Sequence, residues 1–513
     1  MRAATTYRQP GARRYRSPGG AWDVPGLDLL RAGPSDPDAP ALIDGVVSLT
    51  VGDLDGLASR MAGGLRSLGI RRGDVVAWQL PNWWEAVALF HACWRSGALA
   101  APIHHQVGSS EVTRMLDALE AGVVLAAPGS PLAGLVDAIG VRAGDPRFDR
   151  LVSARPAAVR PRGSDVAVVL FTSGSTGSPK AVFHSHRGLS YKAASMAAAH
   201  GLGPGDVALM PSPMAHISGL LNAVLVPGAA RMTAVLMEKW DAERGVHLAG
   251  QHRVSFMIGP PTLFVGMMEV PGYRPKVEAL RVVSCGSMGV TPEFVDAARA
   301  GLGAVVKRTY GSTEAPTITT SSWEDPPERA RDTDGRSVGA AEIAVVEPGT
   351  LRRRPPGVRG EVLVRGPELF VGYGEAAQTK EAVRRGWFAT GDLGTLDEQG
   401  WLTIGGRLKE LIIRGGENIA SAEVERVLEL HPGVRQAVVV GLPDDRLGER
   451  VAAFVVGSPE IDVAWCRQWF ADQGVARFKT PELVVHLDEV PVLGVGKPDR
   501  KALRDLAVAA GRG

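Results

Sequence analysis

The chain has 513 residues, of which 45% are hydrophobic and 22% are charged, and its formal net charge is +2. This length exceeds what one hydrophobic core usually serves, so we expect at least two domains in an ordinary globular protein. The small net charge argues against a nucleic-acid or membrane-surface partner, and the three cysteines lack the spacing of a disulfide framework or a zinc site.

No apolar run is long enough for a membrane helix, and no apolar signal segment lies near the first residue. We therefore expect a cytoplasmic protein in a reducing compartment, without an integral membrane segment. Residues 1–22 contain arginines but no acid, which favours an irregular N-terminal arm over an organelle transit peptide.

The first part of the chain alternates helical and strand patterns. A helix over residues 51–68 is followed by a strand at 74–80 and by a helix that Asn82 is expected to cap and Gly97 to end. A strand at 99–103 completes a βαβ unit. This order predicts an α/β fold whose main sheet is parallel and covered by helices.

Further apolar runs, each followed by a turn, predict more strands at residues 166–171, 207–210, 255–258, 279–284 and 304–308. Ligands gather at the carboxyl ends of strands in open α/β sheets, so we expect the loops after these strands to face one pocket. A smaller β-rich subdomain is predicted by short strands at residues 342–346, 361–364 and 401–404.

The last part of the chain predicts a compact α+β domain. Ser421 is expected to cap a helix that stops before residue 431. Strands are predicted at residues 437–440, 451–456 and 483–485, and one more helix at 462–470.

Residues 171–180 read Phe-Thr-Ser-Gly-Ser-Thr-Gly-Ser-Pro-Lys and follow a buried strand pattern. Glycines allow close backbone approach, hydroxyls donate hydrogen bonds, and a lysine supplies a positive charge, which together suit a polyphosphate. The loop is not a Walker A motif, because its lysine is not followed by Ser or Thr. Alone, it reads equally well as a polar surface turn. The candidate phosphate-binding residues are Thr172, Ser173, Gly174, Ser175, Thr176, Gly177 and Lys180.

Three other clusters have a similar chemical character. Residues 310–314 place an aromatic ring, hydroxyls and a carboxylate at a predicted strand end, which suits a base, a phosphate and a hard cation. Asp392 lies in a predicted turn, where it can accept hydrogen bonds from both hydroxyls of a ribose. Lys497 follows a glycine in a segment near the C-terminus that we expect to be flexible.

The ordered set of motifs resembles the adenylate-forming superfamily, which contains acyl-CoA synthetases, adenylation domains of peptide synthetases and beetle luciferases. The resemblance spans residues 40–505. Within the superfamily, the sequence most resembles short- and medium-chain fatty-acid and cyclohexanecarboxylate CoA ligases. It rests on residues 172–180, 213–219, 310–314, 360–366, 390–393, 406–410, 414–419 and 496–497.

The resemblance implies an N-terminal adenylation domain at residues 1–405, a hinge at 406–409 and a mobile C-terminal lid domain at 410–513. It implies catalytic roles for Lys497, Thr313, Glu314 and His216, with Glu314 holding magnesium and His216 bordering the acid pocket. The other implied ATP- or CoA-binding residues are Gly286, Ser287, Tyr310, Gly311, Ser312, Asp392, Arg407, Lys409, Gly415 and Gly416.

The implied reaction joins a carboxylic acid to coenzyme A through an acyl-adenylate, releasing AMP and diphosphate, with ATP, Mg²⁺ and CoA required. Small and apolar pocket candidates favour a short- or medium-chain aliphatic or alicyclic acid; they are His216, Gly219, Gly259, Pro260, Gly286 and Gly311. One alternative is an adenylation enzyme that loads a carrier protein, and another is a nucleotide-binding sensor without catalysis. No nucleic-acid partner is expected, and a homodimer is left open.

Overall fold

The computed structural model describes residues 12–24, 26–28, 30, 36–172, 179–286, 290–414, 417–444, 446–458, 460–492 and 498–510. The chain divides into two compact units, each built from several stretches of sequence. Unit 1 comprises Met1–Ile343, Leu363–Ala389 and Gly400–Leu402, and unit 2 comprises Ala344–Val362, Thr390–Gln399 and Thr403–Gly513.

The larger sheet of unit 1 has nine strands and is parallel from β13 to β1, with antiparallel strands added at both edges. Four of the predicted strands therefore share one sheet as neighbours, namely β13, β12, β11 and β9. In spatial order the strands are β15 (Arg336–Ser337), β14 (Thr319–Thr320), β13 (Val305–Tyr310), β12 (Val282–Cys285), β11 (Phe256–Gly259), β9 (Val207–Met210), β10 (Thr233–Leu236), β1 (Pro40–Asp44) and β2 (Val47–Thr50).

The second sheet of unit 1 has seven strands and contains the predicted strand at 166–171, which is thus in a different sheet from the other four. Its central strands are parallel, but β8 runs antiparallel to β7, a hairpin that the sequence did not reveal. In order the strands are β18 (Gly372–Tyr373), β8 (Lys180–Ser185), β7 (Val166–Thr172), β4 (Leu99–Pro102), β3 (Val75–Gln79), β5 (Val123–Ala126) and β6 (Ile139–Gly140).

Helices α2 (Val51–Ser67) and α3 (Trp84–Ser96) form close to their predicted positions. Gly97 ends α3 as expected, in a left-handed conformation with φ of 79°. The prediction that Asn82 caps α3 is wrong, because the Asn82 amide bonds to backbone groups outside the helix, including Met214 N at 2.9 Å. Asp44 Oδ2 instead accepts from the N–H of Trp84 at 3.1 Å.

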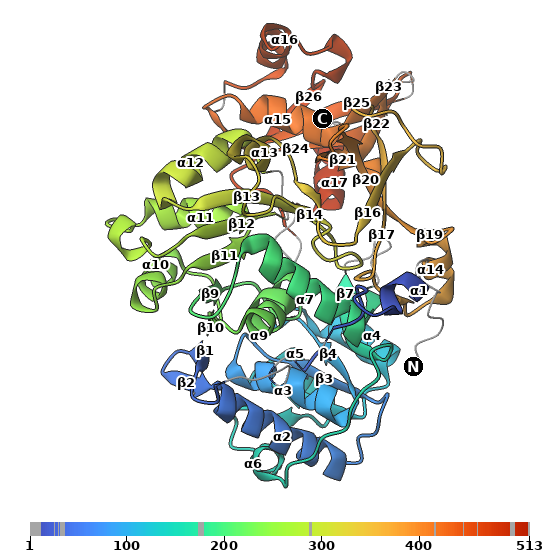
Figure 1. The fold of residues 1–513 in the computed structure, drawn as a ribbon. Helices are drawn as coiled ribbons and strands as arrows, with labels where there is room; N and C mark the ends of the chain where they lie inside the picture. Colours follow the sequence, from blue (N-terminus) through green and yellow to red (C-terminus); the bar gives the residue numbers. More distant parts are fainter. Residues whose placement is uncertain are drawn as a thin grey trace. The chain divides into compact units, whose positions relative to one another are not determined.

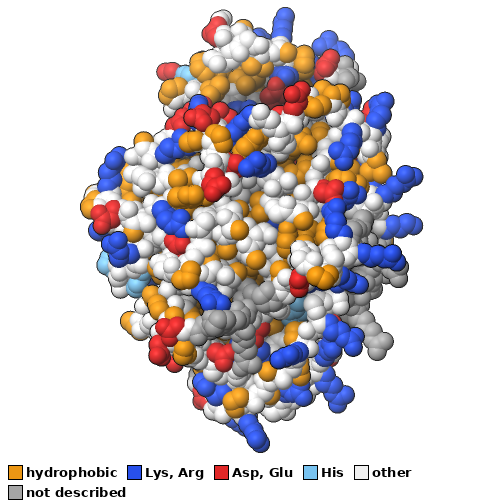
Figure 2. Space-filling model, viewed as in Figure 1, with side chains coloured by type: hydrophobic (Ala, Val, Ile, Leu, Met, Phe, Trp, Pro, Cys, Tyr) orange, Lys and Arg blue, Asp and Glu red, His pale blue; other side chains and the backbone are white. Residues whose placement is uncertain are grey.

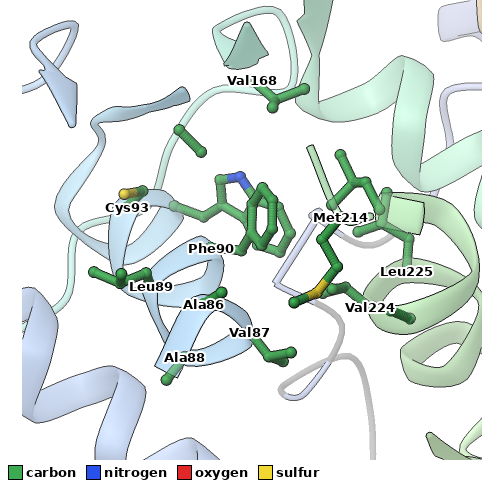
Figure 3. Close-up of a cluster of buried hydrophobic side chains, with 14 of the residues drawn as sticks. Ala86, Val87, Ala88, Leu89, Phe90, Cys93, Val168, Met214, Val224 and Leu225 are labelled. Carbon is green, nitrogen blue, oxygen red and sulfur yellow. The ribbon is translucent and has the colours of Figure 1, made fainter. Parts of the chain in front are cut away.

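The main core of unit 1 surrounds α3, whose residues are buried on every side. Figure 3 shows Phe90 and Val87 of α3 lying toward Met214 and Leu225, which come from the segment before α8 (Ile217–Leu220) and from the π-helical turn Leu221–Leu225. Figure 1 shows α7 (His186–His200) and α9 (Val226–Ala230) between the strands of the two sheets. The core thus fixes the segment that carries His216.

The other α-helices of the described part of unit 1 cover its sheets or lie at their edges (Figure 1). The expected irregular arm includes a short helix, α1. These helices are α1 (Ala12–Arg16), α4 (Ser109–Leu119), α5 (Pro131–Leu135), α6 (Pro146–Ser153), α10 (Ala242–Gln251), α11 (Pro261–Glu269), α12 (Pro292–Leu302), α13 (Pro327–Asp332) and α14 (Ala376–Ala382).

A third sheet forms the predicted β-rich subdomain. Its strands are β16 (Glu342–Val346), β17 (Gly360–Arg365), β20 (Trp387–Leu396) and β19 (Val383–Arg384), with β21 (Leu402–Arg407) paired to β20. Asp392 therefore lies in strand β20, not in the turn that the sequence predicted, although the preceding Gly391 has a positive φ of 73°.

The last part of the chain forms the expected α+β arrangement within unit 2. Ser421 is the first residue of its helix and not the cap, and its Oγ donates to Glu410 O at 2.8 Å. The strands are β23 (Glu417–Ala420), β22 (Leu411–Arg414), β25 (Gly448–Gly457), β24 (Val434–Asp444) and β26 (Leu483–His486), and the helices are α15 (Ser421–Glu429), α16 (Val463–Asp472) and α17 (Arg500–Ala510).

Among the helices in the described part of the chain, none combines the length and apolar character needed to cross a bilayer. On the face drawn in Figure 2, basic and acidic side chains both occur, as the small net charge leads one to expect.

Candidate active site

The two ends of the predicted phosphate loop lie side by side in unit 1. Thr172 ends β7, Lys180 begins β8, and the two residues are cross-strand partners in this antiparallel pair. The sheet therefore fixes Thr172 and Lys180 beside each other. The remaining predicted loop residues lie outside the described part of the chain; they are Ser173, Gly174, Ser175, Thr176 and Gly177. Four other predicted site residues also lie outside it, namely Ser287, Gly415, Gly416 and Lys497.

Two glycines near the end of β13 lie so close to neighbouring residues that a side chain would not fit at either position. A Cβ at Gly286 would lie 2.7 Å from Thr309 Cγ2, and one at Gly311 would lie 2.4 Å from Thr317 N. Gly286 N also donates to Gly259 O at 3.2 Å. A backbone hydrogen bond thus joins the ends of β11 and β12, and Gly286 lies close against Thr309 of β13.

The turn after β13, residues 311–314, is held by strand β8 and by the segment that precedes β18. His184 of β8 contacts Thr313 O at 2.7 Å, and the N–H of Phe370 donates to Glu314 O at 2.8 Å. Burial lowers the pKa of His184 to about 4, so its ring is neutral at pH 7 and Nε2–H donates to the carbonyl. The hydroxyl of Ser312 accepts from the N–H of Ala315 at 3.2 Å within the turn.

Glu314 is also held through its side chain. The hydroxyl of Tyr373 donates to Glu314 Oε1 at 2.7 Å, and Lys180 Nζ lies over the Tyr373 ring, 5.3 Å from its centroid. Burial, together with the carboxylate of Glu314, raises the pKa of Tyr373, so its hydroxyl keeps its proton. The structure thereby brings together the lysine of the phosphate loop and the carboxylate of the 310–314 motif.

His216 is the residue immediately before α8, and other histidines lie beside it. Its ring centroid is 4.9 Å from that of His104, which stacks on His105 at 4.8 Å. Burial and the two neighbouring histidines lower the pKa of His104 to about 3, and its Nδ1 accepts from the N–H of Gln106 at 3.1 Å. A neutral imidazole therefore packs against His216.

Sequence reasoning missed His104, His184 and Tyr373. Each acts on a predicted site residue that is distant along the chain, and the contact depends on how strands pair and pack. The adjacent histidines at 104 and 105, at the end of a predicted strand, were the one signal that could have been noticed.

In unit 2, Asp392 and Arg407 form an ion pair, with 2.7 Å between Asp392 Oδ1 and Arg407 Nε. The aspartate side chain is 5% exposed and the arginine 52%. Thr390 Oγ1 donates to Val362 O at 2.8 Å and accepts from the N–H of Asp392 at 3.0 Å, which fixes the strand at the acid. Lys409 is exposed in the short 3₁₀ turn Leu408–Glu410 that follows β21.

Comparisons with known proteins identify the family of the chain. Residues 30–374 match the family model of AMP-binding enzymes, and residues 423–497 match that of the AMP-binding enzyme C-terminal domain. The chain is 31% identical to the medium-chain fatty-acid–CoA ligase of Escherichia coli K12 over 534 residues, covering 98% of this chain and 94% of that protein.

Solved structures of similar fold include two enzymes of known ligand state. ATP-bound MatB from Rhodopseudomonas palustris superimposes with a TM-score of 0.87 at 27% identity, covering 94% of this chain and 99% of that one. The o-succinylbenzoate CoA synthetase MenE from Bacillus subtilis, in complex with the acyl-adenylate intermediate OSB-AMP, superimposes with a TM-score of 0.83 at 27% identity, covering 94% and 98%.

Proposed function

The chain belongs to the AMP-binding enzyme family and is an ATP-dependent acid–CoA ligase, and we propose that its substrate is a short- or medium-chain aliphatic or alicyclic carboxylic acid. The expected acyl-CoA synthetase class is confirmed by relatives of this kind that align over nearly the whole chain. ATP and CoA are accordingly its co-substrates.

The chemistry explains why ATP is needed. A thiol cannot usefully displace oxide from a carboxylate, so the acid must first receive a better leaving group. The carboxylate oxygen attacks the α-phosphorus of ATP, the bond to diphosphate breaks, and an acyl-adenylate forms. The CoA thiol then attacks the acyl carbon, and AMP leaves with the electron pair of the broken C–O bond.

We assign the first step to the residues of unit 1. Thr172 and Lys180, fixed side by side at the ends of the loop, bind the β- and γ-phosphates. Tyr310 stacks on adenine and Thr313 binds the α-phosphate from the turn that His184 holds. Negative charge grows on the phosphate oxygens during the reaction, so such preorganised donors stabilise the transition state more than the substrates.

We assign magnesium to Glu314, where the bound ion would neutralise phosphate charge. The hydrogen bond from Tyr373 uses Oε1, which leaves Oε2 as a ligand atom. Within the described residues there is no group of three or more His, Cys, Asp or Glu side chains arranged for a metal. One carboxylate is sufficient for Mg²⁺, which keeps water and phosphate oxygens as its other ligands.

The Asp392–Arg407 pair carries the ribose assignment, and Asp392→Asn tests it. Asparagine keeps the shape but has only one acceptor oxygen and no charge, so it cannot accept from both ribose hydroxyls and pair with Arg407. We expect the KM for ATP to rise roughly tenfold, as for the loss of a hydrogen bond to a charged group, with a smaller change in kcat. Steady-state kinetics at saturating acid measure this.

Asp397→Asn provides the matched control. Asp397 follows the same strand, and its carboxylate accepts from the N–H of Gln399 at 2.9 Å. An equal rise in the KM for ATP in both variants would contradict the ribose assignment.

The acid is proposed from the pocket candidates. A Cβ at Gly259 would lie 2.4 Å from Leu263 Cδ1, so an apolar side chain borders this strand end beside Gly286. A panel of linear, cyclic and aromatic acids, assayed for AMP release with CoA present, tests the proposal. One methylene group changes kcat/KM by roughly 10- to 200-fold in an apolar pocket, so the panel will separate acids by size.

We expect the highest kcat/KM for an aliphatic or alicyclic acid. An aromatic acid at the top of the panel would overturn the proposed substrate class but not the ligase activity. Free CoA and a phosphopantetheinylated carrier protein are compared as acceptors in the same assay, and a strong preference for the carrier would overturn CoA as the physiological thiol.

A further inference from the structure

We propose that Tyr373 is a positioning residue that holds the Glu314 carboxylate and the Lys180 ammonium apart and in fixed relation before the nucleotide binds. This inference rests on the proposed function, in which Glu314 holds magnesium and Lys180 binds phosphate. Tyr373 itself touches neither nucleotide nor metal in this assignment and acts through its two neighbours.

The position of Tyr373 is set by sheet pairing. Strand β18 runs antiparallel to β8, so that Tyr373 is opposite Val182, two residues from Lys180. The N–H of Gly374 donates to Ala181 O at 2.9 Å, which extends the pairing toward the lysine. Only 6% of Tyr373 is exposed. The backbone therefore delivers a buried phenol to the side of Lys180.

The same segment also fixes Glu314 at two points. The Tyr373 hydroxyl bonds to the carboxylate at 2.7 Å, and the N–H of Phe370 bonds to the Glu314 carbonyl at 2.8 Å. The Phe370 and Tyr373 rings meet edge to face at 4.9 Å, and the N–H of Tyr373 donates to Thr379 Oγ1 at 2.8 Å. The phenol consequently has little freedom to move relative to Glu314.

The phenol interacts favourably with both the carboxylate of Glu314 and the ammonium of Lys180, so the two groups need not pair with each other. Its hydroxyl makes a charge-assisted hydrogen bond to the carboxylate, and its ring face attracts the ammonium 5.3 Å away. A direct Lys180–Glu314 ion pair would occupy the groups needed for phosphate and magnesium. Because the phenol contacts both groups, it keeps them from pairing and keeps each oriented for its ligand.

Two variants of Tyr373 separate the hydroxyl from the ring. Tyr373→Phe removes the hydrogen bond to Glu314 but keeps the ring under Lys180, and Tyr373→Leu removes both. The matched control is Tyr191→Phe, because the Tyr191 hydroxyl accepts from the N–H of Ala340 at 2.6 Å in the same unit. Isothermal titration calorimetry with ATP, with and without Mg²⁺, measures binding in the absence of turnover, and thermal unfolding measures stability.

We expect Tyr373→Phe to weaken binding of Mg²⁺-ATP roughly tenfold, as for loss of a residue that orients a metal ligand, and to leave binding of metal-free ATP unchanged. Tyr373→Leu should weaken both, because Lys180 then pairs with Glu314. Tyr191→Phe should change neither. In the Glu314→Gln background, Tyr373→Phe should cause no further loss.

Equal affinity of Tyr373→Phe and Tyr191→Phe for Mg²⁺-ATP would overturn the inference. It would also be overturned if both variants lost affinity in proportion to a loss of thermal stability. A full additional loss in the Glu314→Gln background would also overturn it. If ATP binding by the wild-type protein does not depend on Mg²⁺, the assignment of Glu314 to magnesium fails as well. If Mg²⁺ strengthens ATP binding equally in the wild-type protein and in Tyr373→Phe, the inference about Tyr373 is rejected, while the assignment of Glu314 to magnesium stands.

Discussion

Replacement of Lys497 by alanine is expected to slow acyl-adenylate formation by about 10²- to 10³-fold and to leave conversion of supplied acyl-adenylate to acyl-CoA largely intact. The assignment comes from the sequence, in which Lys497 follows Gly496 as the last of the ordered motifs. Lys497 lies outside the described residues, so a functional measurement is the direct test.

The asymmetry follows from where charge develops. Attack at the α-phosphorus places negative charge on phosphate oxygens and on the departing diphosphate, and an ammonium group stabilises both. In the second step the thiol attacks an acyl carbon and AMP departs as an already stable phosphate monoester. A lysine that serves only the first transition state therefore affects one half-reaction.

The two half-reactions are measured separately, by acid-dependent exchange between diphosphate and ATP and by thioester formation from synthetic acyl-adenylate. Lys501→Ala is the matched control, since Lys501 is exposed and pairs with Asp505 one helical turn away, at 2.9 Å. An equal loss in both half-reactions for Lys497→Ala would reject its proposed role.

The sequence predicted most elements of regular structure because their signals are local. Strands β9 and β16 have the predicted bounds, and α3 ends at the predicted glycine. Apolar periodicity and a glycine able to adopt positive φ are properties of a few neighbouring residues. Such signals need no knowledge of the rest of the fold.

The errors arise where a distant group replaces a local one. Asn82 has the right chemistry for a helix cap, but Asp44, forty residues away in sequence, bonds to the first N–H of α3 instead. The hairpin formed by β7 and β8 was also missed, because the six-residue strand after the loop was not recognised. The cap of α3 and the pairing of β7 with β8 both depend on contacts in the folded chain that the local sequence pattern does not show.

The candidate site shows the same division. Motif residues such as Glu314 and Asp392 were identified by their chemical types and order along the chain. Tyr373 and His184 were not, because each is defined by a contact that only the paired strands create. Sequence thus predicted the groups expected to touch substrates, and the structure added the groups that hold them in place.

The second large effect is expected for Lys409→Pro, which should preserve the diphosphate exchange reaction and block thioester formation. We propose that Lys409 is the hinge about which the C-terminal residues change position between the half-reactions. The reason is chemical, since Lys497 is needed near the phosphates in the first step, whereas the CoA thiol must reach the acyl carbon in the second.

The local structure explains why proline would hold one conformation. Lys409 occupies the middle of the 3₁₀ turn Leu408–Glu410, with the N–H of Leu411 bonded back to Leu408 O. Proline fixes φ near −65°, a value that such turns use, and it disfavours a helical conformation at the preceding Leu408. The variant therefore removes backbone freedom at Leu408 and at position 409, which a rotation at this point requires.

Lys409→Ala is the matched control, because it removes the exposed side chain and keeps the freedom of φ. If rotation at this residue is required, the proline variant should lose thioester formation from supplied acyl-adenylate far more completely than the alanine variant, which loses only what the lysine side chain contributes to ligand binding. Normal turnover with CoA by Lys409→Pro would refute the hinge. An equal loss in both variants would instead assign the effect to the lysine side chain, since alanine and proline share its absence but differ in backbone freedom.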